Sequence, residues 1–283
     1  MNFCRLSLCF PAILCFLLPT VAETIRYRPV SQQVVESRLK RYAGNDRQRE
    51  EALKQMFTDA GCDGAHLSEQ AVKFTRQPNV ICELPGSSDE VIIVGAHFDH
   101  VSLGDGVVDN WSGASLLPSL YEAVKVEPRR HCYIFIGFTD EEKGEIGSRY
   151  YAEHMSKQEV AETDAMVNMD TLGLTHTEIW ASHSDARLTG ALIYMAKQLN
   201  LPISAVNVEH IGSTDSVQFA ARKIPSITVH SLNQENWNAH ILHTSKDRIS
   251  EINMDDYYET YKLMGAYLAF LDEVAGAKRA GAK

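Results

Sequence analysis

Hydrophobic and polar positions along the chain follow two alternating periods, one typical of strands and one typical of helices. Residues 91–94 form a short β-branched apolar run, and residues 133–138 form a second one. Short apolar runs of this kind are typical of strands that are buried on both faces. Residues 165–169 and 224–229 continue the series, with segments of helical period between them. The alternation predicts an α/β fold whose doubly wound, mostly parallel central sheet is flanked by helices.

The segments with helical period lie on both sides of these runs. Two of them fall within residues 31–60 and are separated by Gly44-Asn45-Asp46. A third, at residues 114–126, contains Pro118, which is expected to kink or break the helix. The other predicted helices are residues 146–154, 184–200, 212–223 and 253–275, and the other strands are residues 178–181, residues 203–208 and a pair within residues 72–84 that turns at Gln77-Pro78.

Neither an internal repeat nor a long linker interrupts this pattern. The sequence therefore predicts one domain over residues 23–275, followed by a small, basic and flexible tail at residues 276–283. The formal net charge is −10 at pH 7. Lys and Arg form no cluster along the sequence that would offer a phosphate-binding face. We therefore exclude nucleic acid as a partner.

Residues 1–22 have the composition of a secretory signal peptide. Arg5 stands near the start, residues 6–18 form an apolar core, and Thr20-Val21-Ala22 offers a small-residue cleavage site. The alternative, an uncleaved membrane anchor, is disfavoured because the apolar core is too short to span a bilayer comfortably. We expect cleavage after Ala22, a secreted or periplasmic protein, and no stable membrane association after the signal is removed.

Three cysteines remain after residue 22, an odd number for an exported protein. A disulfide between Cys62 and Cys82 could link the end of a helix to the first strand. Cys132 lies in an apolar run and is expected to be a buried free thiol. Since the three cysteines lack the close spacing of a thiolate site, a metal in this protein would rely on nitrogen and oxygen ligands.

Imidazole and carboxylate side chains follow several predicted strands at the point where each strand ends. Open α/β sheets place their sites at the carboxyl ends of the strands, so we expect these side chains to meet. The residues concerned are His97, Asp99 and Asp109 after the first buried strand, Glu141 and Glu142 after the second, Asp170 after the third, and His243 in the loop beyond the last strand.

Two imidazoles and three carboxylates suit zinc, with manganese or cobalt as weaker candidates. Asp109 would bridge two ions roughly 3.5–4 Å apart, which share a water and lower its pKa towards neutrality. Asp99 would accept the second ring proton of His97. Glu141 stays free beside Glu142 and would act as general base towards the bridging hydroxide.

Other residues of the same types have simpler explanations. His100, His230 and His240 are expected to be solvated or structural, and His240 is the alternative to His243 as a ligand. His243 is preferred because Thr244 and Asp247 frame it.

The residues at the strand ends also form five blocks that resemble metallopeptidase family 28, the di-zinc aminopeptidases. The resemblance runs from about residue 31 to the closing helix and implies that the protein removes single amino acids from peptide N-termini. It implies one zinc on His97, Asp109 and Asp170 and a second on Asp109, Glu142 and His243. The blocks are His97-Phe98-Asp99, Gly106-x-x-Asp109-Asn110-x-Ser112-Gly113, Glu141-Glu142-x-Gly144-x-x-Gly147-Ser148, Asn168-Met169-Asp170 and His243-Thr244-x-x-Asp247.

The resemblance also implies a place for Asp215 near the substrate pocket, in Ser213-Thr214-Asp215-Ser216. Family members often carry His where this chain has Ser216, and an apolar residue where it has Glu145. Both departures bear on specificity and leave the implied metal ligands intact.

Three functions follow as hypotheses. The first is a di-zinc aminopeptidase that acts on peptides with a free N-terminus, whose amine would meet Asp170. The second is a glutaminyl cyclase-like aminoacyltransferase, which uses a similar fold with one zinc. The third is a non-catalytic binding module on the same fold, which predicts missing ligands, whereas this chain has all of them.

Overall fold

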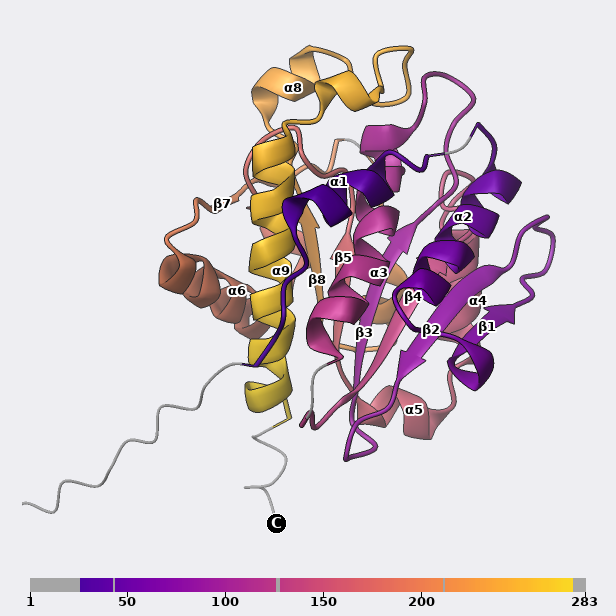
Figure 1. The fold of residues 1–283 in the computed structure, drawn as a ribbon, viewed down its shortest axis with the longest axis vertical. Coiled ribbons are helices and arrows are strands. Elements are labelled where there is room, and N and C mark those ends of the chain that lie inside the picture. The colour runs from indigo at the N-terminus through magenta and orange to yellow at the C-terminus, as the bar shows by residue number, and fades with distance from the viewer. Residues whose placement is uncertain (1–25, 43, 126–127, 211, 277–283) are drawn as a thin grey trace, which may run out of the picture.

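The computed structural model describes residues 26–42, 44–125, 128–210 and 212–276. The expected signal peptide at residues 1–22 and nearly all of the expected tail at residues 276–283 lie outside the described residues. Within them, one eight-stranded sheet has the strand order β1-β2-β4-β3-β5-β8-β6-β7 (Figure 1). The strands are β1 (Leu67–Gln70), β2 (Asn79–Leu84), β3 (Val91–His97), β4 (Cys132–Phe138), β5 (Thr163–Met169), β6 (Glu178–Ile179), β7 (Ser204–Ala205) and β8 (Ser226–His230).

The centre of the sheet is parallel, and both of its sides include antiparallel pairs. β3 pairs in parallel with β4 and β5, and β5 pairs in parallel with β8. β2 runs antiparallel to β1 and β4, while β6 runs antiparallel to β8 and parallel to β7. The prediction of a doubly wound α/β sheet flanked by helices is therefore confirmed, with a mixed sheet.

Helices cover both faces of this sheet because alternate strand residues point to opposite sides. Ile92 and Val94 of β3 face a core shared with α1, α2, α3 and α9, and Ile93 faces a second core with α4 and α7. The helices are α1 (Gln32–Leu39), α2 (Asp46–Asp59), α3 (Ser112–Val124), α4 (Ile146–His154), α5 (Lys157–Glu162), α6 (Ala186–Leu199), α7 (Ser216–Ala221), α8 (Gln234–Asn238) and α9 (Met254–Val274), with single turns η1 (Gly64–His66), η2 (Val107–Trp111), η3 (Ala181–His183) and η4 (Ile249–Glu251).

The expected break at Pro118 is wrong, because α3 continues through it. Proline in a helix costs about 3 kcal/mol through a lost hydrogen bond and a ring clash. Nearly every residue of α3 is buried. Packing against β3, β4, α1, α2 and α9 holds the helix in place.

Three shorter expectations are also corrected. The first strand of the expected pair lies at Leu67–Gln70, and the Thr75 hydroxyl closes a loop instead by donating to the carbonyls of Val72 and Gln77. The strand expected at residues 203–208 is reduced to Ser204–Ala205. Cys132 is a free thiol but is only partly buried, because it opens β4 at the edge of the core.

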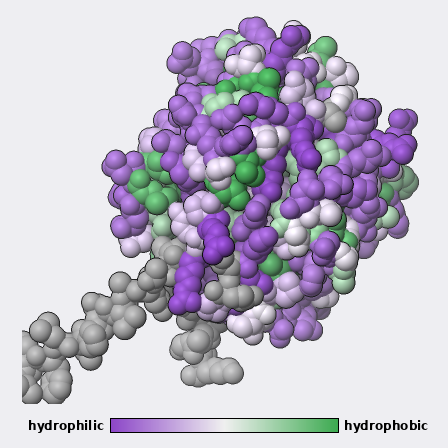
Figure 2. Space-filling model, in the orientation of Figure 1, coloured by the Kyte–Doolittle hydropathy of each residue, from purple (hydrophilic) through white to green (hydrophobic). Residues whose placement is uncertain are grey.

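The disulfide between Cys62 and Cys82 is present and ties the end of α2 to β2. Among the helices in the part of the chain that the structure describes, none combines the length and apolar character needed to cross a bilayer. Figure 2 shows a mainly hydrophilic face on which apolar residues gather only in small, separate patches.

Candidate metal centre

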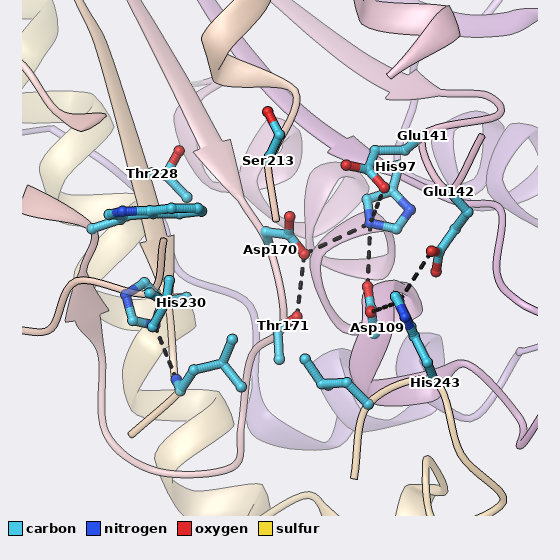
Figure 3. A pocket seen from close by; sticks show the side chains of 14 residues that line it. His97, Asp109, Glu141, Glu142, Asp170, Thr171, Ser213, Thr228, His230 and His243 are labelled. Atoms are coloured by element: carbon cyan, nitrogen blue, oxygen red, sulfur yellow. Dashed lines mark hydrogen bonds and ion pairs between the residues drawn. The ribbon is translucent and has the colours of Figure 1, made fainter. Parts of the chain in front are cut away.

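The candidate ligands meet because β3, β4 and β5 are parallel and end at one edge of the sheet. His97 is the last residue of β3 and lies in register with Phe138, the last residue of β4. Asp170 directly follows β5, and Glu141 follows β4 by three residues. The turn η2 brings Asp109, and a loop between α8 and η4 brings His243. Figure 3 shows these side chains around one pocket.

Asp109 lies between the two imidazoles. Its Oδ1 is 3.3 Å from Nε2 of His97, and its Oδ2 is 3.0 Å from Nε2 of His243. Each oxygen of one carboxylate therefore faces a different imidazole, which is the arrangement that a bridging ligand requires.

The other acids divide between the same two imidazoles. Asp170 Oδ1 is 3.6 Å and Glu141 Oε2 is 3.8 Å from Nε2 of His97. Glu142 Oε2 is 3.1 Å from Nε2 of His243. In the groups His97, Glu141, Asp170 and Asp109, Glu142, His243, one donor atom from each residue lies within 4.8 Å of the others. The neighbours Glu141 and Glu142 thus point to different groups, as their adjacent positions predict.

Asp99 connects His97 to the segment that carries both glutamates. Nδ1 of His97 lies 3.3 Å from the backbone carbonyl of Asp99 and 3.5 Å from Oδ1 of its carboxylate. The same carboxylate accepts hydrogen bonds from the backbone N–H of Glu141 at 3.0 Å and of Glu142 at 3.2 Å. Asp99 is buried, so its negative charge is not screened by water.

Two further polar residues, Asp247 and Asn110, hold the segment that carries Asp109. Asp247 accepts the backbone N–H of Val108 at 2.8 Å and of Asp109 at 3.0 Å. Asn110 donates to the carbonyl of Met169 and so joins this turn to the end of β5. The signal for Asp247 was its place in the last sequence block, four residues after His243.

Asp170 is held by Thr214, two residues before α7 begins. Thr214 donates its hydroxyl to Oδ2 of Asp170 at 2.7 Å and accepts from the side-chain amide of Asn168 at 2.7 Å. Asp215, next in the chain, is fully buried and is not on the pocket wall. Burial raises the pKa of Asp215 to about 7, with the nearby carboxylate of Asp170 contributing. A role for Asp215 in substrate binding stays a prediction.

The wall of the pocket beyond Asp170 combines apolar and polar side chains. Trp180, Val208 and Leu232 form a small buried cluster there, with Leu242 packed against it. His230 also lines the pocket, but both ring nitrogens are occupied: Nε2 lies 2.9 Å from the carbonyl of Val206, and Nδ1 accepts the N–H of Leu232. Burial lowers the pKa of His230 to about 4, so the ring is neutral, which agrees with the expected structural role.

The other two histidines are also placed by the structure. His240 is exposed and does not line this pocket. His100 lies 3.0 Å from Asp46 and away from the ligand groups.

Burial and crowding of charge shift the pKa values of the central groups strongly. Burial raises the pKa of Glu141 to about 10, and the charges of Asp215, Asp170 and Asp109 add to the shift. Hydrogen bonds to Asp109 and Glu142 raise the pKa of His243 to about 10. Burial alone would raise the pKa of Asp109, but His243 and His97 hold it well below its ordinary value.

The donor set fits a pair of divalent metal ions. The donors are imidazole nitrogens and carboxylate oxygens, which suit zinc. Oε1 of Glu142 is buried and has no hydrogen-bond partner among the described residues. A buried carboxylate oxygen without a partner is costly, and a cation beside it would remove that cost.

A sheet that gathers two imidazoles and several carboxylates at its carboxyl edge defines the class of α/β metallohydrolases. Within that class, the chain belongs to peptidase family M28, whose family model matches residues 79–268.

Individual known proteins show the same likeness. Aminopeptidase YwaD of Bacillus subtilis is 26% identical over 190 residues, which cover 62% of this chain and 40% of that protein. This chain spans less than two thirds of the length of each of the first curated relatives that it matches.

The fold is shared with solved structures of two kinds. BSAP, a zinc aminopeptidase from Bacillus subtilis, has a TM-score of 0.63 at 23% identity, covering 73% of this chain and 52% of that one. A glutaminyl cyclase from an Acidobacteriales bacterium has a TM-score of 0.71 at 16% identity, covering 87% of this chain and 97% of that one.

Proposed function

We propose that this protein is an aminopeptidase that binds two zinc ions and removes the N-terminal residue of peptides. The observation that carries the proposal is the position of Asp109, with one oxygen towards His97 and the other towards His243. His97, Asp109 and Asp170 would hold one ion, and Asp109, Glu142 and His243 the other. Relatives named aminopeptidases support the reaction class.

Two bound zinc ions would polarise the scissile carbonyl and lower the pKa of a water between them. Glu141 belongs to neither of the two proposed ligand sets, and its carboxylate lies near Nε2 of His97. In its ionised form Glu141 takes a proton from the attacking water and then passes that proton to the departing amide nitrogen. The C–N bond breaks, and a free amino acid and a shortened peptide leave.

Asp99 supports this chemistry without contacting substrate. It fixes the ring of His97 so that Nε2 faces Asp109 and Asp170, and it holds the backbone that carries both glutamates. Ligands oriented in this way need not rearrange when the metal binds.

Cleavage from the N-terminus agrees with the shape and charge of the pocket. Asp170 offers a negative charge that a substrate ammonium group can approach. The buried side chains of Trp180, Val208 and Leu232 line the pocket beside it. We expect them to limit this pocket to one residue, which is the requirement for exopeptidase action.

The second candidate is a glutaminyl cyclase-like enzyme with one zinc. It is favoured by one observation, since a cyclase structure matches over 97% of its own length. Two separate groups of candidate ligands, with Asp109 close to the histidine of each, favour the aminopeptidase instead.

The deciding experiment measures zinc per chain together with hydrolysis of aminoacyl anilides, before and after chelation and zinc return. We expect two zinc ions and chelator-sensitive release of the N-terminal residue. Glu141→Gln should keep both ions and lower kcat by about 10²–10⁴, the usual contribution of a general base. One zinc with ammonia released from an N-terminal glutamine peptide would establish the cyclase instead.

The last part of the proposal is that the protein is exported from the cytoplasm. The Cys62–Cys82 disulfide is the kind of bond that persists in oxidising compartments. It supports a secreted or periplasmic enzyme whose peptidase domain spans residues 23–275, followed by the tail at residues 276–283, after removal of residues 1–22.

A further inference from the structure

A buried arginine lies beneath the candidate metal centre. Arg49 belongs to α2, outside the residues that match the family, and its side chain is completely buried. Its guanidinium donates from Nη1 to the carbonyl of Phe98 at 3.2 Å and from Nη2 to the carbonyl of Asp105. Its central carbon lies 5.7 Å from the centre of the Trp111 ring.

These contacts fall on the two segments that carry the bridging site. Phe98 stands between His97 and Asp99, and Asp105 begins the loop that leads to Asp109. One rigid guanidinium therefore touches the backbone of both segments at once. A fork of fixed geometry can set a spacing between two carbonyls, which a single flexible ammonium cannot do.

The loop is shaped to receive this side chain. Gly106 has a φ of +55°, and a Cβ there would lie 3.0 Å from Nη2 of Arg49 and only 2.4 Å from Cβ of His100. The left-handed backbone and the missing side chain let the loop approach the guanidinium.

The charge of Arg49 is matched to its surroundings. Burial lowers the pKa of Arg49 to about 10, while the charges of Asp46, Asp247, Asp99 and Asp109 oppose that shift. The side chain is therefore a cation at neutral pH, buried among carboxylates. Removing it would leave those carboxylates uncompensated, and an uncompensated buried charge is strongly destabilising.

We propose that Arg49 is a positioning residue for the metal centre, holding the His97 and Asp109 segments at the spacing that the two ions require. The inference rests on the proposed function, because it assumes that these segments bind metal. Arg49 acts through the two backbone segments and touches neither substrate nor metal.

The chain offers a matched control in Arg38 of α1. Arg38 is only 7% exposed and donates to the hydroxyl of Ser119 at 2.9 Å and to Glu122 at 2.7 Å, both on α3. It is a buried arginine of similar kind whose contacts do not reach the ligand-bearing segments.

The test compares Arg49→Met, Arg49→Lys and Arg38→Met with the wild type. Zinc affinity is measured by competition with a chelator, ligand geometry by the visible absorption spectrum of the Co²⁺-loaded protein, and stability by thermal unfolding of the metal-free protein. In Arg49→Met, zinc should bind about 10–100-fold more weakly with a changed Co²⁺ spectrum. Arg49→Lys should lose less affinity, and Arg38→Met should lower the unfolding temperature while keeping the wild-type affinity and spectrum.

Wild-type affinity and spectrum in both Arg49 variants would overturn the proposal. An equal loss of affinity in Arg38→Met would overturn it too, because the effect would then reflect general stability. If Arg49→Met does not fold, Arg49→Lys decides: weaker zinc binding with a changed spectrum supports the proposal, and wild-type values reject it. A wild-type protein that binds no zinc would contradict the proposed function instead.

Discussion

Two clusters of histidine and carboxylates lie at opposite ends of the same strands. At the carboxyl edge, His97 ends β3 beside Asp109, Glu141 and Asp170. At the amino edge, His131 directly precedes β4 and lies beside Asp164 of β5 and Glu90, which precedes β3. The donor atoms of His97, Glu141 and Asp170 lie within 4.8 Å of one another, and so do those of Glu90, His131 and Asp164.

One half of each cluster is built in the same way. Nδ1 of His131 lies 3.1 Å from Oδ1 of Asp272 in α9, as Nδ1 of His97 lies near Asp99. Asp272 accepts the backbone N–H groups of Arg130 and His131, as Asp99 accepts those of Glu141 and Glu142. Each histidine thus has a carboxylate behind it that is itself fixed by the backbone.

The other half of each cluster differs. Nε2 of His131 faces one carboxylate, Asp164, at 3.3 Å, and Arg130 forms an ion pair with Glu90 and donates to the carbonyl of Ala275. Nε2 of His97 faces three carboxylates and lines a pocket. The two clusters therefore share a carboxylate-backed histidine and differ in how many carboxylates face its Nε2 atom and in whether the histidine lines a pocket.

We expect the two clusters to differ most when one carboxylate is neutralised at each edge of the sheet. Asp109→Asn removes the oxygen charge shared by both proposed ions, so we expect loss of zinc and a fall in kcat/KM of roughly a thousandfold or more, or several kcal/mol of transition-state stabilisation. Asp164→Asn should keep both zinc ions and the wild-type rate. Metal analysis after dialysis and anilide kinetics measure both. Zinc loss in Asp164→Asn would show that the amino-edge cluster also binds metal.

A smaller contrast should come from the carboxylate behind each histidine. Asp99→Asn should weaken zinc binding about 10–100-fold, the usual cost of removing such a partner. Asp272→Asn should leave zinc affinity unchanged and lower the free energy of unfolding by about 1.5–3 kcal/mol, because hydrogen bonds to a charged group are lost. Chelator competition and urea unfolding separate the two effects. If Asp272→Asn weakened zinc binding as much as Asp99→Asn, the two ends could not be independent.

The sequence predicted the carboxyl-edge cluster better than the amino-edge one for a local reason. Strand ends can be read from apolar runs, so the sequence alone places His97, Glu142 and Asp170 at one edge of the sheet. His131 precedes a strand, and its partner Asp272 is 141 residues away in α9. No local pattern reports such a pairing.

The same limit explains what was missed within the site. Trp180, Val208 and Leu232 line the pocket from three separate segments, each of which follows a different strand. Arg49 was read only as part of a helix, because its contacts with Phe98 and Asp105 cross about 50 residues of chain. Local sequence predicts that Pro118 kinks or breaks a helix. The packing on every side of α3, which keeps the helix continuous, is a tertiary effect that the local sequence does not show.

The smallest and most specific contrast is the pH dependence of the amino-edge cluster. Burial by itself would lower the pKa of His131, but Asp164 and Asp272 raise it above 6.5, and His131 in turn lowers the pKa of Asp272 below 3.8. The stabilisation from His131 is therefore fully present below about pH 6.5 and is lost as the pH rises through its folded pKa. The contribution of Asp272 is present above about pH 3.8 and is lost as the pH falls.

Urea unfolding of metal-free wild type and His131→Gln should then differ most near pH 5 and less at pH 9, by about 1.4 kcal/mol for each unit by which the pKa is raised. Comparing the two proteins cancels the titration of His97 and His243, so a difference that stayed constant between pH 5 and pH 9 would mean that folding does not raise the pKa of His131.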